Sequence, residues 1–179
     1  KAKILFEVEG MELHKRFAKM LSSKLRESIR THLIDLNTMI ALGDCQTSQA
    51  MALYYGVFES GERSEAFRQL IRMIERDGRK MDVGVLGARV IFHVLAQFGR
   101  ADLAYEMITT KEFPSYAWWL GQGATTLWED FRRPGEQVTS RNHHFWGDIS
   151  HWMIRWIAGL QVGRKMDKVH IQFCPQFIE

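Results

Sequence analysis

A regular spacing of apolar residues near the start of the chain constrains its fold more than any other feature. Apolar side chains recur every four positions there, at Phe17, Leu21, Leu25, Ile29 and Leu33. Because an α-helix completes a turn every 3.6 residues, side chains with this spacing lie on one face. The pattern predicts one long amphipathic helix over residues 13–33.

Five further helices are expected along the rest of the chain. Gly43 and Asp44 break the first pattern, and glycines that tolerate a left-handed cap follow later segments at Gly56, Gly78 and Gly99. The expected helices cover residues 47–55, 67–78, 86–98, 101–108 and 145–160. Six helices of alternating length with short links predict an all-α domain of stacked helical hairpins.

Two segments depart from the helical pattern. Residues 113–135 contain two prolines, paired tryptophans and several glycines, so we expect a non-helical connection, whose length in a helical domain indicates function. Beyond Gly159, apolar and polar residues alternate over 169–173, which predicts a strand that ends before Pro175. Since one strand cannot form a domain, we expect its partners outside the chain. The predicted domains are therefore 1–160, which is helical, and 161–179, the start of a β-domain.

Composition excludes several classes of protein. With 46% hydrophobic and 25% charged residues, the 179-residue chain is typical of a soluble globular protein. No apolar run approaches the roughly 18 residues of a membrane span, and the net charge of +3 is scattered, which argues against nucleic-acid binding. Cys45 and Cys174 match no redox or zinc spacing and are expected to be structural free thiols. The start lacks a signal peptide and an initial Met, which indicates a trimmed or partial chain.

The densest chemical signal lies in residues 121–129 and 140–147. Together they hold a carboxylate at Glu129, two threonines, Asn142, two histidines and two tryptophans. Indoles stack on the apolar faces of sugars, and Asn, His and carboxylates pair with sugar hydroxyls. A carboxylate beside Trp128 would also be partly desolvated. The inventory predicts a sugar site.

These residues resemble bacterial α-L-rhamnosidases of glycoside hydrolase family 78, whose catalytic domain is a six-hairpin (α/α)6 toroid. Residues 113–116 read Phe-Pro-Ser-Tyr and 122–129 read Gln-Gly-Ala-Thr-Thr-Leu-Trp-Glu, which resemble two family motifs. Ser-Arg-Asn-His at 140–143 is similar to its asparagine–histidine motif, and 46–50 and 83–87 resemble two further segments. Two departures are Gly121, where the family usually has an acidic residue, and Tyr116, where it usually has Trp.

The resemblance implies a fold and an activity. The chain would be the C-terminal half of the catalytic domain, a partial (α/α)6 toroid that ends in the first strand of a β-domain. It would belong to an inverting exo-glycoside hydrolase that releases terminal α-linked L-rhamnose without a cofactor. Glu129 would be the general base and His143 would contact rhamnose. The general acid would lie outside the chain, because the acidic family motif that carries it is absent here.

Further substrate-binding residues are predicted from the same window: Asn142, Trp128, Trp118, Trp119 and Trp146. The last three lie off any helical stripe and are the preferred stacking platforms, whereas Trp152 and Trp156 follow the stripe of the last predicted helix and are expected in the core. The expected partners are a rhamnose-containing glycan or glycoside and the N-terminal half of the catalytic domain, with neither nucleic acid nor membrane. The compartment stays open between cytoplasm and periplasm of a bacterium.

Alternatives remain open at this point. Another (α/α)6 enzyme, such as an unsaturated uronyl hydrolase, would lack the motif at 122–129. A non-catalytic helical scaffold would place Glu129 on an exposed outer loop. His144 and Asp148 stand four residues apart, as metal ligands on a helix do, but two ligands do not make a site, so no metal is predicted. Asp44, Glu59, Asp82 and Asp148 have no motif that marks a catalytic acid.

Overall fold

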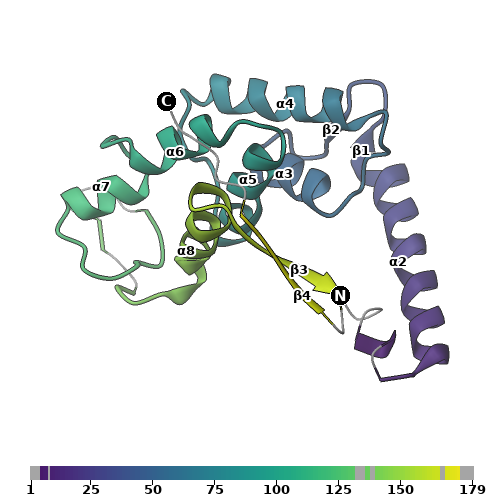
Figure 1. Cartoon of the computed structure of the whole chain (residues 1–179). Helices are drawn as coiled ribbons and strands as arrows, with labels where there is room; N and C mark the ends of the chain where they lie inside the picture. Colours follow the sequence, from purple (N-terminus) through teal and green to yellow (C-terminus); the bar gives the residue numbers. More distant parts are fainter. Residues whose placement is uncertain (1–4, 8, 132–135, 138–139, 166–167, 174–179) are drawn as a thin grey trace.

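The computed structural model describes residues 5–7, 9–131, 136–137, 140–165 and 168–173, and it is mainly helical (Figure 1). Seven α-helices lie between residues 12 and 152: α2 (Glu12–Leu33), α3 (Gln46–Tyr54), α4 (Arg63–Arg76), α5 (Val85–Gln97), α6 (Ala101–Thr109), α7 (Tyr116–Gly121) and α8 (Asp148–Trp152). A 3-10 turn, η1 (His144–Gly147), precedes α8, and a π-helical turn, η2 (Met153–Ile157), continues it. The predicted all-α fold and the helices expected at 13–33, 47–55, 67–78, 86–98 and 101–108 are confirmed.

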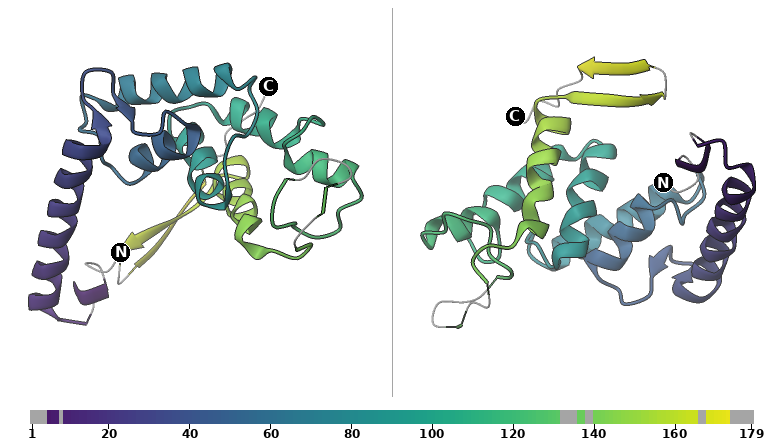
Figure 2. Two further views of the ribbon diagram at one scale, coloured as in Figure 1. Left: turned by 180° about the vertical axis from the view of Figure 1, so that it is seen from behind. Right: turned by 90° about the horizontal axis from the view of Figure 1, so that it is seen from below.

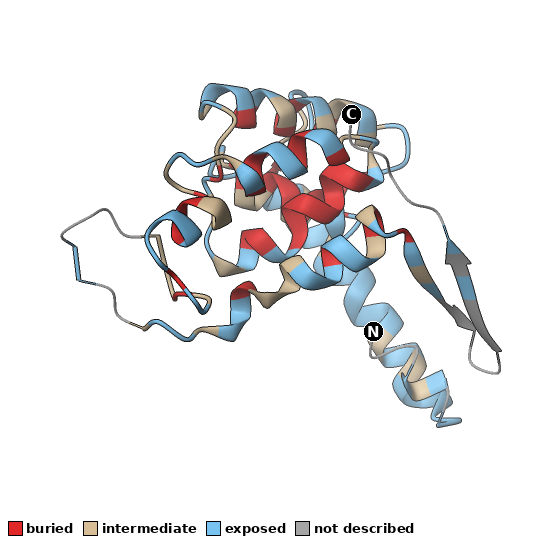
Figure 3. Ribbon diagram, turned by 60° about the vertical axis from the view of Figure 1, so that its left-hand side comes forward, coloured by how far each residue is buried: buried red, intermediate tan, exposed pale blue. Residues whose placement is uncertain are grey.

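Helix α5 forms the centre of the core. Every residue from 90 to 96 is buried, and α5 packs against α3, α6 and α8 (Figure 3). Gly87 permits the close approach to α3, because a Cβ at this position would lie 2.4 Å from Thr47 Oγ1 and 2.8 Å from Val83 Cβ. Trp152 and Trp156 are buried as predicted, and the Trp152 indole donates to the carbonyl of Phe92 at 2.9 Å.

Helix α2 extends away from the other helices, as the two views in Figure 2 show, and none of its residues is buried. Its apolar stripe is exposed at Phe17, Leu21 and Leu25. Polar contacts attach its C-terminal half to the segment before α4: Arg30 forms a two-pronged hydrogen bond to the Glu62 carboxylate at 2.7 and 2.8 Å. The amphipathic pattern therefore predicted the helix correctly, but the apolar face of the helix is not covered by other parts of the described structure.

Two short elements differ from the prediction. The connection at 113–135 was expected to be non-helical, yet it contains α7, because the Ser115 hydroxyl accepts the backbone N–H of Trp118 at 2.8 Å and caps the helix start. A small hairpin, β1 (Ile34–Asp35) paired with β2 (Ile40–Ala41), follows α2 and was also missed. The sixth predicted helix is divided among η1, α8 and η2 and ends before Gly159, whose φ is 73°.

The expected C-terminal strand is present, but the prediction that its partners lie outside the chain is wrong. Strand β4 (Lys168–Phe173) pairs antiparallel with β3 (Leu160–Lys165), with Leu160 opposite Phe173. The sequence of β3 has no clear alternation to reveal it. This hairpin projects from the helices in Figure 2. The division into domains at residue 160 stays a prediction.

Two expectations from composition concern the described residues. No helix among them has the length and apolar character needed to cross a membrane. The thiol of Cys45 is free, and Cys174 lies outside the described residues.

Candidate sugar-binding site

Glu129 lies in the non-helical segment that follows α7. Its backbone N–H donates to the carbonyl of Ser140 at 2.9 Å, and the N–H of His143 donates to the carbonyl of Leu127 at 2.7 Å. These two bonds join segment 127–129 to segment 140–143 in an antiparallel arrangement. The two motifs singled out in the sequence, separated by a polar loop, are thus side by side.

A cavity of about 760 Å³ lies at this junction. Its wall contains Glu129 and His143, together with the loop 81–85 before α5 and the pair Phe113 and Pro114. Four of the segments that carried the family resemblance, 83–87, 113–116, 122–129 and 140–143, therefore meet at one cavity. The Nδ1 atom of His143 is buried and has no hydrogen-bond partner among the described residues, so it is available to a polar ligand.

Most of the predicted stacking tryptophans are core residues instead. Trp118, Trp119 and Trp146 are buried, and only Trp146 of the three contributes to the cavity wall. The Trp119 ring stacks on Phe131 with centroids 4.0 Å apart, and Trp146 meets both rings edge-on. Because both side chains are buried and neither lines the cavity, the structure gives no support to Trp118 and Trp119 as sugar platforms.

These indoles support the backbone of the site. Trp146 Nε1 donates to the carbonyl of Glu129 at 2.8 Å, and Trp119 Nε1 donates to the carbonyl of Asp130 at 3.2 Å. The Tyr116 hydroxyl donates to the carbonyl of Trp146 at 3.1 Å. Burial, with a smaller contribution from the charge of Asp148, raises the pKa of Tyr116, so its hydroxyl stays protonated as a donor. The departure at Tyr116 from the family pattern thus has a structural role in this chain.

The remaining predicted residues lie beside the cavity. Trp128 is buried beneath the guanidinium of Arg141, 5.4 Å from its ring centre, and Asn142 is exposed. Neither lines the cavity. By contrast, Phe145 and Asp82 do line it, although neither was selected from the sequence. Asp82 immediately precedes the segment 83–87 that resembles a family motif, and this position was the signal that could have found it.

A group of three possible metal ligands lies elsewhere, at His93, Asp148 and His151. The indole of Trp156, which can only donate, gives its N–H to His93 Nδ1 at 2.8 Å. A neutral His93 therefore carries its proton on Nε2, which lies 2.9 Å from Asp148 Oδ2 and donates to it. Because a protonated ring nitrogen cannot ligate a cation, this hydrogen bonding favours a structural His–Asp pair. Burial is the largest single influence on Asp148 and opposes its ionisation, but the hydrogen bonds and charges of His93 and His151 together outweigh it and lower the pKa of Asp148.

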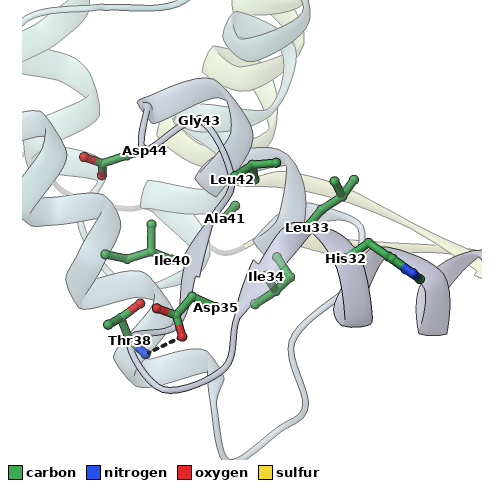
Figure 4. Close-up of a pocket in the computed structure, with 10 residues that line it drawn as sticks. All are labelled: His32, Leu33, Ile34, Asp35, Thr38, Ile40, Ala41, Leu42, Gly43 and Asp44. Carbon is green, nitrogen blue, oxygen red and sulfur yellow. Dashed lines mark hydrogen bonds between the residues drawn. The ribbon is translucent and has the colours of Figure 1, made fainter.

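A second cavity, of about 460 Å³, lies beside the β1–β2 hairpin and contains none of the predicted site residues (Figure 4). One of its polar residues, Asp35, accepts hydrogen bonds from the backbone N–H groups of Asn37 at 2.9 Å and Thr38 at 3.4 Å. These bonds lower the pKa of Asp35 and fix the hairpin turn. The carboxylate thus serves the turn rather than a ligand.

Stacked helical hairpins with a carboxylate and a histidine at one cavity are an arrangement suited to sugar chemistry, and comparison with known proteins defines the family. Residues 2–157 match the model of the bacterial alpha-L-rhamnosidase 6 hairpin glycosidase domain. The chain belongs to this family.

Individual relatives agree with that assignment. The chain is 28% identical over 153 residues to an alpha-L-rhamnosidase from Streptomyces avermitilis, covering 80% of this chain and 15% of that protein. A solved alpha-L-rhamnosidase from Dictyoglumus thermophilum superposes with a TM-score of 0.79 at 25% identity, covering 90% of this chain and 18% of that one. The Streptomyces avermitilis enzyme complexed with L-rhamnose gives a TM-score of 0.75 at 26% identity, with 92% and 18% covered. The chain thus spans less than a fifth of the length of these relatives.

Proposed function

We propose that this chain supplies the general base, Glu129, of an inverting exo-glycoside hydrolase that releases terminal α-linked L-rhamnose. The observation that carries the proposal is the cavity shared by Glu129 and His143 in a domain of the rhamnosidase family. The remainder of the catalytic domain, on residues outside this chain, would complete the site and supply the general acid. The division at residue 160 between this domain and a following β-domain belongs to the same proposal.

In this reaction the Glu129 carboxylate accepts a proton from a water molecule. The water oxygen then attacks the anomeric carbon of rhamnose on the face opposite the leaving group, while the general acid protonates the departing oxygen. The two carboxyl groups of an inverting hydrolase stand roughly 6.5 to 9.5 Å apart, which leaves room for the water. The Nδ1 atom of His143, which has no hydrogen-bond partner among the described residues, would accept a hydrogen bond from a sugar hydroxyl.

The backbone contacts of Glu129 suit this role. A general base must hold one position relative to its water, and small misplacements of reacting groups are costly in rate. The Glu129 amide and carbonyl are both hydrogen-bonded, to Ser140 and Trp146. This fixed backbone at a cavity wall also favours an active site over the scaffold hypothesis, which expected Glu129 on an exposed outer loop.

The stereochemistry of the product tests the proposal. We expect the intact protein to release rhamnose from an aryl α-L-rhamnoside, and proton NMR during the first minutes to show the β-anomer before mutarotation. A first-formed α-anomer would exclude the inverting mechanism. Absence of rhamnose release from any α-L-rhamnoside would contradict the proposed activity as a whole.

A further inference from the structure

Phe145 is an exposed aromatic ring beside the proposed base. It lines the cavity of Glu129, and 48% of its surface is exposed, in contrast to the buried Trp146 that follows it. The rings of His143 and His144 meet Phe145 edge-on, with centroids 4.8 and 4.5 Å away. Because about half of its surface is nevertheless exposed, the ring of Phe145 is accessible to a ligand.

A smaller hollow of about 260 Å³ adjoins this ring. Its wall consists of Phe145, Arg89, His144 and Asp148, so Phe145 separates it from the larger cavity. The two cavities therefore share one exposed aromatic wall. A ligand that extends beyond the larger cavity over Phe145 would reach the smaller one.

The charges of this hollow define the ligand groups that fit it. Asp148 already accepts a hydrogen bond from His93 at 2.9 Å, and its second carboxylate oxygen lies 3.6 Å from His151 Nδ1. Arg89 is exposed on α5, and it forms no ion pair or hydrogen bond with any other residue that the structure describes. A guanidinium has five N–H donors and no acceptor. The group that binds beside it must therefore present an acceptor oxygen.

We propose that Phe145 and Arg89 form the subsite for the leaving-group sugar. The ring of Phe145 stacks on the apolar C–H face of a pyranose, and Arg89 donates to a hydroxyl or carboxylate oxygen of that same sugar. The inference rests on the proposed exo-hydrolase function: when only the terminal rhamnose reacts, any second sugar next to its cavity belongs to the leaving group. In this proposal Phe145, rather than the buried Trp118 and Trp119, is the aromatic residue that stacks on sugar.

Kinetics of the intact protein with three substrates test this subsite. The substrates are α-L-rhamnosyl fluoride, which has no leaving-group ring, rhamnose α-linked to a neutral hexose, and rhamnose α-linked to a uronic acid. For Phe145→Ala we expect kcat/KM on both disaccharides to fall roughly 3- to 10-fold, the usual size of one aromatic contact. The value for the fluoride should fall by less than the values for the disaccharides, because the fluoride carries no leaving-group ring that could stack on Phe145. Phe145→Tyr, which keeps the ring, should restore the disaccharide activity.

Arg89→Met keeps the length of the side chain and removes its donors. A larger loss on the uronic acid substrate than on the neutral one would identify a carboxylate as the partner, and equal losses would identify a hydroxyl.

Tyr105→Ala, which removes an exposed ring on α6, serves as the control and should leave kcat/KM unchanged for all three substrates. Losses for Phe145→Ala that are equal on the fluoride and the disaccharides, or no loss on any substrate, would overturn the proposal. No loss for Arg89→Met would remove Arg89 from the subsite. In each of these cases the wild-type protein still releases rhamnose, so failure of the subsite is distinguishable from failure of the proposed function.

Discussion

At the residue scale, the proposed site combines the Glu129 carboxylate and the His143 ring with buried indoles that hold its backbone in place. Glu129 and His143 were selected by motif, and both line one cavity. Trp118, Trp119 and Trp146 were predicted to stack on sugar because they lie off the helical stripes. That criterion does not distinguish a ring that binds a ligand from a ring that is buried against other aromatic side chains. Their indole N–H groups find backbone carbonyls at positions 129 and 130, which is a requirement of burial that a linear sequence does not reveal.

His143 gives the first prediction at this scale. His143→Ala in the intact protein should weaken binding of free L-rhamnose by about 1 to 3 kcal/mol, because a sugar hydroxyl loses its buried partner. Isothermal titration calorimetry measures this change. His144→Ala, at an exposed neighbour that does not line the larger cavity, is the matched control. Unchanged affinity for His143→Ala would make His143 a structural residue only.

At the scale of elements, apolar periodicity predicted α4 and α5 because burial and helical geometry act together in them, and it predicted α2 from spacing alone, since that helix buries no residue. The elements that were missed are short and depend on single polar contacts. Helix α7 begins at the hydroxyl of Ser115, and the β1–β2 turn is held by the carboxylate of Asp35. Strand β3 gains its register only from pairing with β4. Such contacts are decided by tertiary structure rather than by local pattern.

The attachment of α2 predicts a dependence of stability on pH. The hydrogen bond from Arg30 lowers the pKa of Glu62 from its ordinary 4.5 to about 2. A carboxylate whose pKa is lower in the folded state stabilises the fold fully above pH 4.5 and loses this contribution as pH falls towards 2. The difference in thermal unfolding midpoint between wild type and Glu62→Gln should therefore be largest near neutral pH and narrow markedly by about pH 3.

Glu112→Gln is the control for that measurement. Its ion pair with Lys80 is exposed, with 71% of the Glu112 side chain accessible, and solvent screens such pairs. We expect little effect of Glu112→Gln on stability at either pH. A Glu62→Gln effect that is the same at both pH values would show that Arg30 does not bind the ionised carboxylate.

At the scale of the whole molecule, exposed apolar surface predicts how the isolated chain behaves. Helix α2 buries no residue and presents an apolar face that includes Leu13, Phe17, Leu21 and Leu25. Faces of this kind promote association. The 179-residue chain produced alone should self-associate and lack rhamnosidase activity, and Phe17→Lys with Leu21→Lys should reduce the association seen by light scattering. A monodisperse, fully active monomer would show that the general acid lies within these residues.

Replacement of Glu129 tests the proposed general base. Glu129→Gln in the intact protein should reduce kcat on an aryl α-L-rhamnoside by about 10² to 10⁴-fold, the usual cost of losing a general base. Rhamnose binding should remain measurable, because the amide keeps the shape of the carboxylate. Glu106→Gln, which removes an exposed carboxylate paired with Arg79, should leave kcat unchanged. A Glu129→Gln enzyme with kcat within about threefold of wild type, a change of less than 1 kcal/mol in barrier, would contradict the assignment of Glu129 as the base.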